Sequence, residues 1–269
     1  REHYPVKILV TNDDGISSPG LYALKQALDG HGKVAVIAPS SNHSASGRRI
    51  TIGESLEVDE VGFADGATGY SVSGTPVDCV RLAALGFLDW EPDIVVSGIN
   101  LGHNLGDDIT YSGTVAAAFE GILLGLPAIA VSIEAGESYN FEPVAAFAAG
   151  LAAKITGGGI PGDVLLNINS PNLPAGEIKG AEVTRLGKRI YRDQLVDETD
   201  GNGPGTRKRY YIYGDDPSYH EEEGTDFHAI SEKKISVTPI HFALTNLDGM
   251  EIIRGWNLDG LLPHGHEVG

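Results

Sequence analysis

Short apolar segments alternate with segments of helical periodicity along the first two thirds of this chain, and this alternation limits the possible folds more than any other feature. Residues 6–11 form an apolar run with the character of a buried strand. Residues 19–29 place leucines at helical spacing, and residues 33–38 form a second apolar run. A strand, a helix and a second strand in this order predict a βαβ unit, which implies a parallel sheet covered by helices.

The same alternation continues to about residue 180. Further strands are expected over residues 70–73, 93–97, 128–133 and 164–168, and further helices over 75–85, 114–124 and 141–155. The pattern predicts an α/β fold with a doubly wound, mostly parallel sheet, contained in a core domain of residues 1–180.

The composition changes after residue 180. The stretch 188–232 is rich in charged residues, glycine and tyrosine, with strands expected over 189–191 and 209–213. A further strand over 235–239 is expected to return to the core. Residues 181–269 are therefore predicted to be a C-terminal extension with a β-hairpin arm. An isolated hairpin buries little surface, so we expect the arm to pack on a partner subunit.

Charge and cysteine content exclude several classes of function. The chain of 269 residues has a formal net charge of −18, which disfavours binding to duplex nucleic acid because that depends on lysine and arginine at phosphates. This negative net charge is also compatible with adaptation to high salt. No apolar run approaches the roughly 18 residues of a membrane span, and no signal peptide is recognised. Cys79 is the single cysteine, so the expected location is the reducing cytoplasm.

An acidic pair follows the first predicted strand, in the sequence Asn12-Asp13-Asp14-Gly15. Two neighbouring carboxylates are costly to bury unless a cation neutralises them, and oxygen ligands suit Mg²⁺ or Mn²⁺. The same four residues are typical of a turn. Taken alone, the motif leaves both interpretations open.

Two further loops favour the metal site. The loop 39–47 follows the second strand and contains Ser44, and the loop 97–106 contains Asn100. Because the carboxyl ends of parallel strands meet at one edge of a sheet, we expect these loops to lie beside Asp13 and Asp14. Two carboxylates, a hydroxyl and an amide oxygen form a reasonable ligand set for a hard divalent cation.

The segment Tyr111-Ser112-Gly113-Thr114 precedes an apolar helix. Free N–H groups at a helix start can bind an anion, and a serine or threonine there can equally serve as the N-cap. Asp107 and Asp108 are interpreted as a solvated acidic pair. His264 and His266, near the end of the chain, are interpreted as solvated rather than metal-bound.

Five motifs occur together in the order found in the SurE family, the survival-protein nucleotidases. They are Asn12-Asp13-Asp14-Gly15, Asn42-His43-Ser44 after Ala38-Pro39, Ser73-Gly74-Thr75-Pro76, Ser97-Gly98-Ile99-Asn100 with Gly102 and Asn104, and Tyr111-Ser112-Gly113-Thr114. The chain resembles this family closely over residues 6–135. The resemblance continues more loosely through Gly224-Thr225-Asp226 and Ser236-Val237-Thr238-Pro239.

The resemblance implies a Rossmann-like core and a swapped C-terminal arm that makes a homodimer or homotetramer. It also implies a divalent-metal-dependent phosphatase, a 5'/3'-nucleotidase that hydrolyses nucleoside 5'- and 3'-monophosphates, with one Mg²⁺ or Mn²⁺ per subunit. By motif matching, the implied metal ligands are Asp13, Asp14, Ser44 and Asn100. The residues implied to surround the phosphate are Asn12, Gly98, Asn104, Ser112, Gly113 and Thr114. The implied catalytic residues are Asp13, Asp14, Asn104 and Ser112.

Three alternatives are weighed against metal-assisted attack of water on phosphorus. An aspartyl-phosphate route through Asp13 is the chemical alternative. A metal-dependent binding or sensing protein without turnover would use the same acidic pair. A nicotinamide dehydrogenase is disfavoured because the first strand is not followed by Gly-x-Gly-x-x-Gly.

Overall fold

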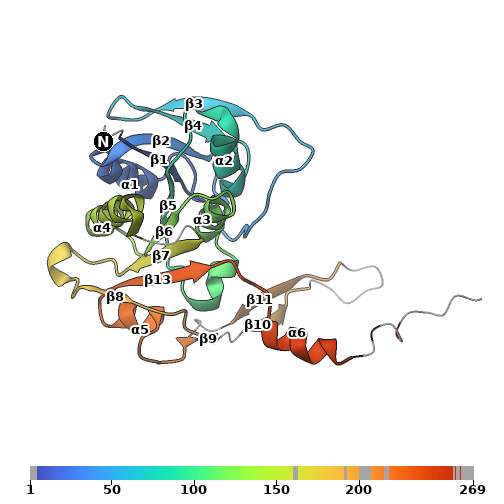
Figure 1. The fold of residues 1–269 in the computed structure, drawn as a ribbon. Helices are drawn as coiled ribbons and strands as arrows, with labels where there is room; N and C mark the ends of the chain where they lie inside the picture. The colour runs from blue at the N-terminus through green and yellow to red at the C-terminus, as the bar shows by residue number, and fades with distance from the viewer. Residues whose placement is uncertain are drawn as a thin grey trace, which may run out of the picture.

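A nine-stranded sheet forms the centre of the molecule (Figure 1). The structure, a computed structural model, describes residues 5–159, 163–190, 193–199, 207–214, 218–256, 258 and 261. In order across the sheet, the strands are β3 (Val58–Gly62), β4 (Thr68–Val72), β2 (Gly32–Pro39), β1 (Val6–Thr11), β5 (Ile94–Leu101), β6 (Ala128–Ile133), β7 (Val164–Ser170), β13 (Ile235–His241) and β8 (Ala181–Val183). The helices are α1 (Pro19–Asp29), α2 (Pro76–Leu82), α3 (Gly113–Leu123), α4 (Phe141–Lys154), α5 (Asp226–Ser231) and α6 (Leu247–Arg254).

Neighbouring strands from β4 to β7 are all parallel, which confirms the predicted sheet type. Antiparallel pairs occur only toward the two margins of this sheet, between β3 and β4 and between β7 and β13. The parallel block places the carboxyl ends of β1, β2 and β5 along one edge.

Helices cover both faces of the sheet, as the doubly wound prediction requires (Figure 1). Helices α1 and α4 lie on one face, and α2 and α3 lie on the other. Within β1, Ile8 and Val10 pack into the first layer, whereas Leu9 between them packs into the second. Cys79 is buried in the second layer. These alternating contacts leave the strands of the parallel block apolar on both sides.

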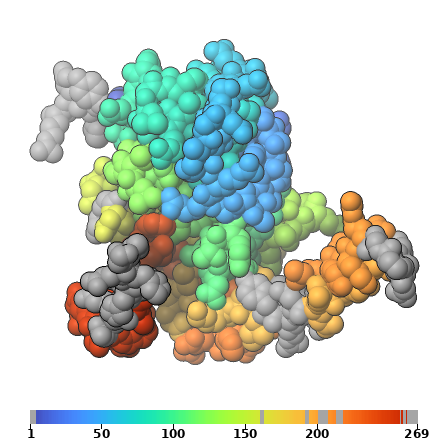
Figure 2. All heavy atoms as spheres, turned by 90° about the vertical axis from the view of Figure 1, so that its right-hand side faces the viewer, coloured from blue at the N-terminus to red at the C-terminus, as the bar shows by residue number. Residues whose placement is uncertain are grey.

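The C-terminal part contributes strands to the sheet and also projects from it. Strand β13 joins β7 in antiparallel register and β8 pairs with β13. Strands β10 (Asp193–Asp197) and β11 (Tyr210–Gly214) form a separate hairpin, at whose base β9 (Arg189–Ile190) pairs with β12 (Ser218–Tyr219). Figure 2 shows this arm, in yellow and orange, on the opposite side from the red residues of the C-terminal helix.

Several differences from the expected elements have local causes. Helix α2 gives way at Ala83 to a wider helical turn that ends at Phe87. Helices α5 and α6 and strands β3 and β8 were not predicted. Three of them, α5, β3 and β8, are short, whereas α6 is amphipathic but has no buried residue. Tyr191, the predicted end of a strand, lies outside the described residues. In the part of the chain that the structure describes, no helix has both the length and the apolar character needed to cross a bilayer.

Candidate active site

The three loops predicted to converge meet at the carboxyl edge of the sheet. The amide of His43 donates to the backbone carbonyl of Asp13 at 2.7 Å, which joins the loop after β2 to the loop after β1. The amide of Leu101, at the end of β5, donates to Oδ2 of Asp14 at 3.3 Å. The expectation that the acidic pair, the Ser44 loop and the Asn100 loop lie together is therefore confirmed.

Asn12 shapes the loop that presents the two acids. Its Nδ2 donates to the carbonyl of Gly15 at 3.0 Å, and its Oδ1 accepts from the amide of Gly15 at 3.1 Å. Gly15 has a φ of +100°, a conformation that residues with a side chain rarely adopt. The turn interpretation and the metal-site interpretation are thus compatible, because the turn is what positions the acids.

The start of α3 approaches Asp13 closely. The Thr114 hydroxyl donates to Oδ1 of Asp13 at 2.5 Å. A Cβ added to Gly113 would lie 2.8 Å from Cβ of Asp13, so only glycine allows this approach. Asp13 itself is 3% exposed. The first of the two acids is therefore held between the end of β1 and the positive end of a helix.

Burial raises the pKa of both carboxyl groups. For Asp13, the loss of solvent outweighs the hydrogen bonds from the Thr114 side chain and from the α3 backbone, so its pKa lies above the ordinary value. For half-buried Asp14, burial and the neighbouring charge of Asp13 raise the pKa to about 6, against the lowering effect of the Leu101 amide. Two acids that disfavour each other's ionisation are the arrangement that a divalent cation relieves.

A cavity of about 270 Å³ opens beside Asp13. Its lining comprises Asp13, Ser44, Ala45, Asn100, Leu101, Asn104, Asp108, Tyr111 and Ser112. Five of the residues that the sequence singled out therefore face one space, although they come from four separate segments. Asp14 lies next to this lining through its hydrogen bond with Leu101.

Hydrogen bonds orient the polar side chains of the cavity. Nδ2 of Asn100 donates to the carbonyl of Gly102 at 2.8 Å, so the amide oxygen is the end available to a cation. Nδ2 of Asn104 donates to the Ser132 hydroxyl at 2.8 Å. Ser112 is the N-cap of α3, and its Oγ accepts from the Val115 amide at 3.1 Å. The N-cap interpretation of Ser112 is confirmed, and the cap faces the cavity.

The donor set fits a hard divalent cation. It combines two carboxylates with the hydroxyl of Ser44 and the amide oxygen of Asn100, and such oxygen ligands suit Mg²⁺ and Mn²⁺. Over the described residues, no three His, Cys, Asp or Glu side chains cluster in a way that would hold a metal ion, so any cation here would also need the neutral oxygens of Ser44 and Asn100. Asp13, Asp14, Ser44 and Asn100 are the residues whose oxygens could hold such a cation.

Four other predicted residues, Asn12, Gly98, Gly113 and Thr114, do not line the cavity. Asn12 and Thr114 are fully buried and act through the hydrogen bonds to Gly15 and Asp13. Gly98 lies within β5, where its φ is +140°, its peptide bond to Ile99 is cis, and an added Cβ would meet the Val131 carbonyl at 2.3 Å. Gly98 therefore shapes the strand end rather than lining the cavity.

Asp108 was wrongly interpreted as a solvated residue. It lines the cavity, and its Oδ2 lies 2.7 Å from Nε of Arg189. Asp107 does point to solvent, where it pairs with Lys188 at 3.3 Å. The short 3-10 helix of residues 106–110 turns these neighbouring acids in different directions. No local pattern distinguishes the two, because the partner Arg189 comes from the C-terminal extension.

Asp226 is a second functional candidate that the sequence did not single out by its chemistry. It is completely buried, and it accepts from the amides of Gly106 and Gly187 at 2.8 Å each and of Phe227 at 3.0 Å. Burial raises its pKa despite these bonds. The bond to Gly106 fixes the start of the turn that carries Asp108. The only sequence signal for Asp226 was its place in the motif Gly224-Thr225-Asp226.

His264 and His266, which were predicted to be solvated, lie outside the described residues.

Comparisons with known proteins agree with this geometry. The family profile described as "Survival protein SurE" matches residues 8–193. The chain is similar to the 5'-nucleotidase SurE of Rubrobacter xylanophilus, with 51% identity covering 96% of this chain and 99% of that protein. It is 47% identical to the 5'-nucleotidase SurE of Geobacter sulfurreducens, with 96% of each chain covered.

A solved structure shows the same similarity in three dimensions. The crystal structure of the SurE protein from Aquifex aeolicus superposes with a TM-score of 0.80 and 42% sequence identity, and the match covers 92% of this chain and 98% of that one. The similarity thus extends through the C-terminal extension as well as the sheet. On the combined evidence of profile, sequence identity and fold, the chain belongs to the SurE family.

Proposed function

We propose that the chain is a divalent-cation-dependent phosphatase that hydrolyses nucleoside 5'- and 3'-monophosphates to nucleoside and phosphate. The observation that carries the proposal is the buried acidic pair, which shares one cavity edge with the oxygens of Ser44 and Asn100. The names of the relatives from Rubrobacter and Geobacter support nucleotides as the substrates. A bound Mg²⁺ or Mn²⁺ supplies positive charge that polarises the phosphoryl group and makes water more acidic.

The start of α3 provides the anion site for the substrate phosphate. Ser112 caps the helix at the cavity, and the positive end of the α3 dipole favours an anion there. Asn104 faces the same space. Its side-chain amide is oriented by the bond to Ser132, and its backbone carbonyl accepts from Asn167 and Asn169 at 2.9 Å each. These groups would hold the phosphoryl oxygens and stabilise the charge that develops during attack.

The two acids have different surroundings and therefore different roles. Asp13 is fixed by Thr114 and is nearly inaccessible, which suits it to anchoring a cation. Asp14 is half-buried and hydrogen-bonded at Oδ2 by the Leu101 amide, so its carboxylate can also orient a water molecule by accepting its O–H. The alternative is attack on phosphorus by an Asp13 oxygen. The configuration at a chiral, isotopically labelled phosphorus distinguishes the two routes. Direct attack of water inverts it, whereas attack by Asp13 followed by attack of water on phosphorus retains it.

Phosphate release from 5'-AMP, 3'-AMP and p-nitrophenyl phosphate tests the proposal. We expect turnover with Mg²⁺ or Mn²⁺, loss of turnover with EDTA, and near-complete loss in Asp13→Asn with the fold retained. A folded protein that binds Mn²⁺ but hydrolyses none of the three esters would instead be a binding or sensing protein. Full activity of Asp13→Asn would contradict the ligand assignment.

The C-terminal arm is proposed to make a homodimer or homotetramer. Its strands leave the side chains of Leu195, Tyr211 and Ile212 exposed in the single chain, which is costly for apolar groups unless another surface covers them. Light scattering of the full chain and of a variant with these three residues changed to serine tests this; a monomeric wild type contradicts it. We also propose that the protein is cytoplasmic. The core domain is proposed to end near residue 180, where the C-terminal extension begins.

A further inference from the structure

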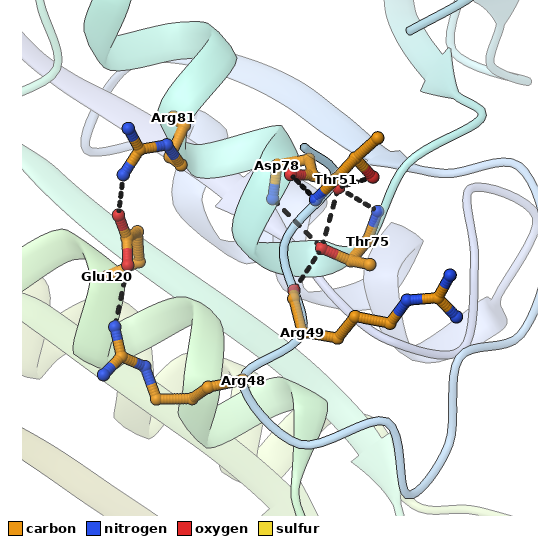
Figure 3. A network of polar contacts seen from close by, with 7 residues as sticks. All are labelled: Arg48, Arg49, Thr51, Thr75, Asp78, Arg81 and Glu120. Atoms are coloured by element: carbon orange, nitrogen blue, oxygen red, sulfur yellow. Dashed lines mark hydrogen bonds and ion pairs between the residues drawn. The ribbon is translucent and has the colours of Figure 1, made fainter. Parts of the chain in front are cut away.

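Helix α3 buries a carboxylate in an otherwise apolar stretch. Glu120 is 3% exposed, and it lies between buried Ala118 and Ile122 on that helix. A charge in such surroundings is costly unless it is paired. Oε2 of Glu120 lies 2.9 Å from Nη2 of Arg48, and Oε1 lies 2.8 Å from Nη1 of Arg81 (Figure 3).

The two arginines connect Glu120 to different parts of the molecule. Arg81 lies on α2, the helix beside α3, whereas Arg48 lies on the long loop between β2 and β3 (Figure 3). Arg48 follows Ser44 by four residues. The pair with Arg81 therefore joins two helices, and the pair with Arg48 joins the loop of Ser44 to the helix that holds Asp13.

The loop of residues 40–57 contains no helix or strand of its own, so its course depends on such attachments. Thr51 donates to Asp78 from its amide at 3.0 Å and from its hydroxyl at 2.7 Å. The Thr75 hydroxyl donates to the carbonyl of Arg49 at 2.8 Å. The attachments at Arg48, Arg49 and Thr51 lie close together along the chain (Figure 3). They hold the segment that follows Ser44 in the sequence, whereas β2 precedes it.

The Arg48 guanidinium makes a second contact beside its ion pair with Glu120. Its guanidinium lies 4.7 Å from the centre of the Phe242 ring, which in turn packs edge-on against Phe119, the neighbour of Glu120 on α3. A side chain held on a ring loses less conformational entropy when it forms an ion pair. The contact therefore makes Arg48 a stiff connection between the loop and α3.

We propose that Arg48 and Glu120 are positioning residues that hold Ser44 in place at the cation site. The inference rests on the proposed function, since it takes Ser44 as a ligand. Partners behind metal ligands commonly change metal affinity by about 10- to 100-fold when they are removed. The same range is expected here, because Ser44 contributes a neutral oxygen from an irregular loop.

Arg48→Met and Arg81→Met form a matched pair for the test. Each substitution removes one positive charge and leaves Glu120 with one arginine, and methionine keeps most of the aliphatic stem. We expect Arg48→Met to weaken Mn²⁺ binding about 10-fold or more by titration calorimetry without substrate. Arg81→Met should stay within about threefold of wild type, and Arg48→Lys should recover most of the loss.

A Ser44→Ala background separates positioning from general support of the fold. In this background Arg48→Met should weaken Mn²⁺ binding no further, because the ligand it positions is gone. Equal losses in Arg48→Met and Arg81→Met, or an undiminished effect of Arg48→Met in Ser44→Ala, would overturn this inference alone. A wild-type protein that binds no Mn²⁺ would overturn the proposed cation site and this inference together.

Discussion

Gly113→Ala tests how closely the start of α3 must approach Asp13. The added Cβ would lie 2.8 Å from Cβ of Asp13 and 2.9 Å from its Oδ2, whereas ordinary contacts begin near 3.4 Å. Asp13 is buried at the end of a central strand, so the strand cannot move aside. The helix start and the carboxylate must therefore separate by about 0.6 Å, the gap that follows from these two distances.

A displacement of this size should reduce activity far more than it reduces stability. Shifts of about 1 Å at a catalytic group can cost about 100-fold in rate, so we expect kcat/KM for 5'-AMP with Mn²⁺ to fall by roughly 10- to 100-fold. The loss should lie mainly in kcat, because the anion site and the cation site move relative to each other.

Gly150→Ala is the control for this experiment. Gly150 lies in α4, and an added Cβ there would meet no atom within 4 Å. Alanine is favoured over glycine inside a helix by about 1 kcal/mol, so this variant should be at least as stable as wild type and fully active. If Gly113→Ala keeps kcat/KM within about threefold of wild type and binds Mn²⁺ unchanged, then the close approach at α3 is not required for catalysis.

Three further predictions concern stability. Mn²⁺ at 100 times its dissociation constant should stabilise the fold by about 2.7 kcal/mol, which corresponds to a rise in Tm of about 5 to 11 °C; calorimetry of Asp13→Asn should show no such rise. In EDTA, the unfolding free energy should fall as pH rises from about 4 to above about 6, because the raised pKa values of Asp13 and Asp14 let the folded form hold more protons than the unfolded form. Urea titrations at several pH values measure this decline, and a decline in Asp14→Asn as steep as in the wild type would refute the explanation. Asp226→Ala leaves three buried amides unpaired, so the unfolding free energy should drop by about 3 kcal/mol or more, and an unchanged urea midpoint would contradict it.

The parts of the fold that the sequence predicted are those whose signal is local. Strands β1 and β6 are observed at the predicted residues, because continuous burial on both faces selects an unbroken apolar run. Strand β8 has three residues and takes its position from β13, so its own sequence carries little information. Helix α6 is amphipathic but has no buried residue within this chain, so a search for buried elements does not find it.

The residues of the candidate site also divide into those with a local sequence signal and those whose position depends on distant contacts. The convergence of Asp13, Ser44 and Asn100 was predictable because each lies at or beyond the carboxyl end of a strand, and these ends meet at one edge of a parallel sheet. The inward direction of Asp108 was not predictable, because it depends on Arg189 from a distant segment. Sequence position therefore identified which loops form the site, whereas side-chain direction depended on tertiary contacts.

Glu120 shows how such long-range contacts can still leave a trace in the sequence. The predicted helix over residues 114–124 is so apolar that it must be buried, and a single acid within it must then find a cation inside the protein. The pattern requires a partner without indicating which one, and eighteen other lysines and arginines would have served as well as Arg48. The structure selects Arg48 and Arg81, and only the first of these lies on the loop of a proposed ligand. A lone acid in a buried helix therefore predicts that a basic residue from another segment, here an irregular loop, is held against that helix.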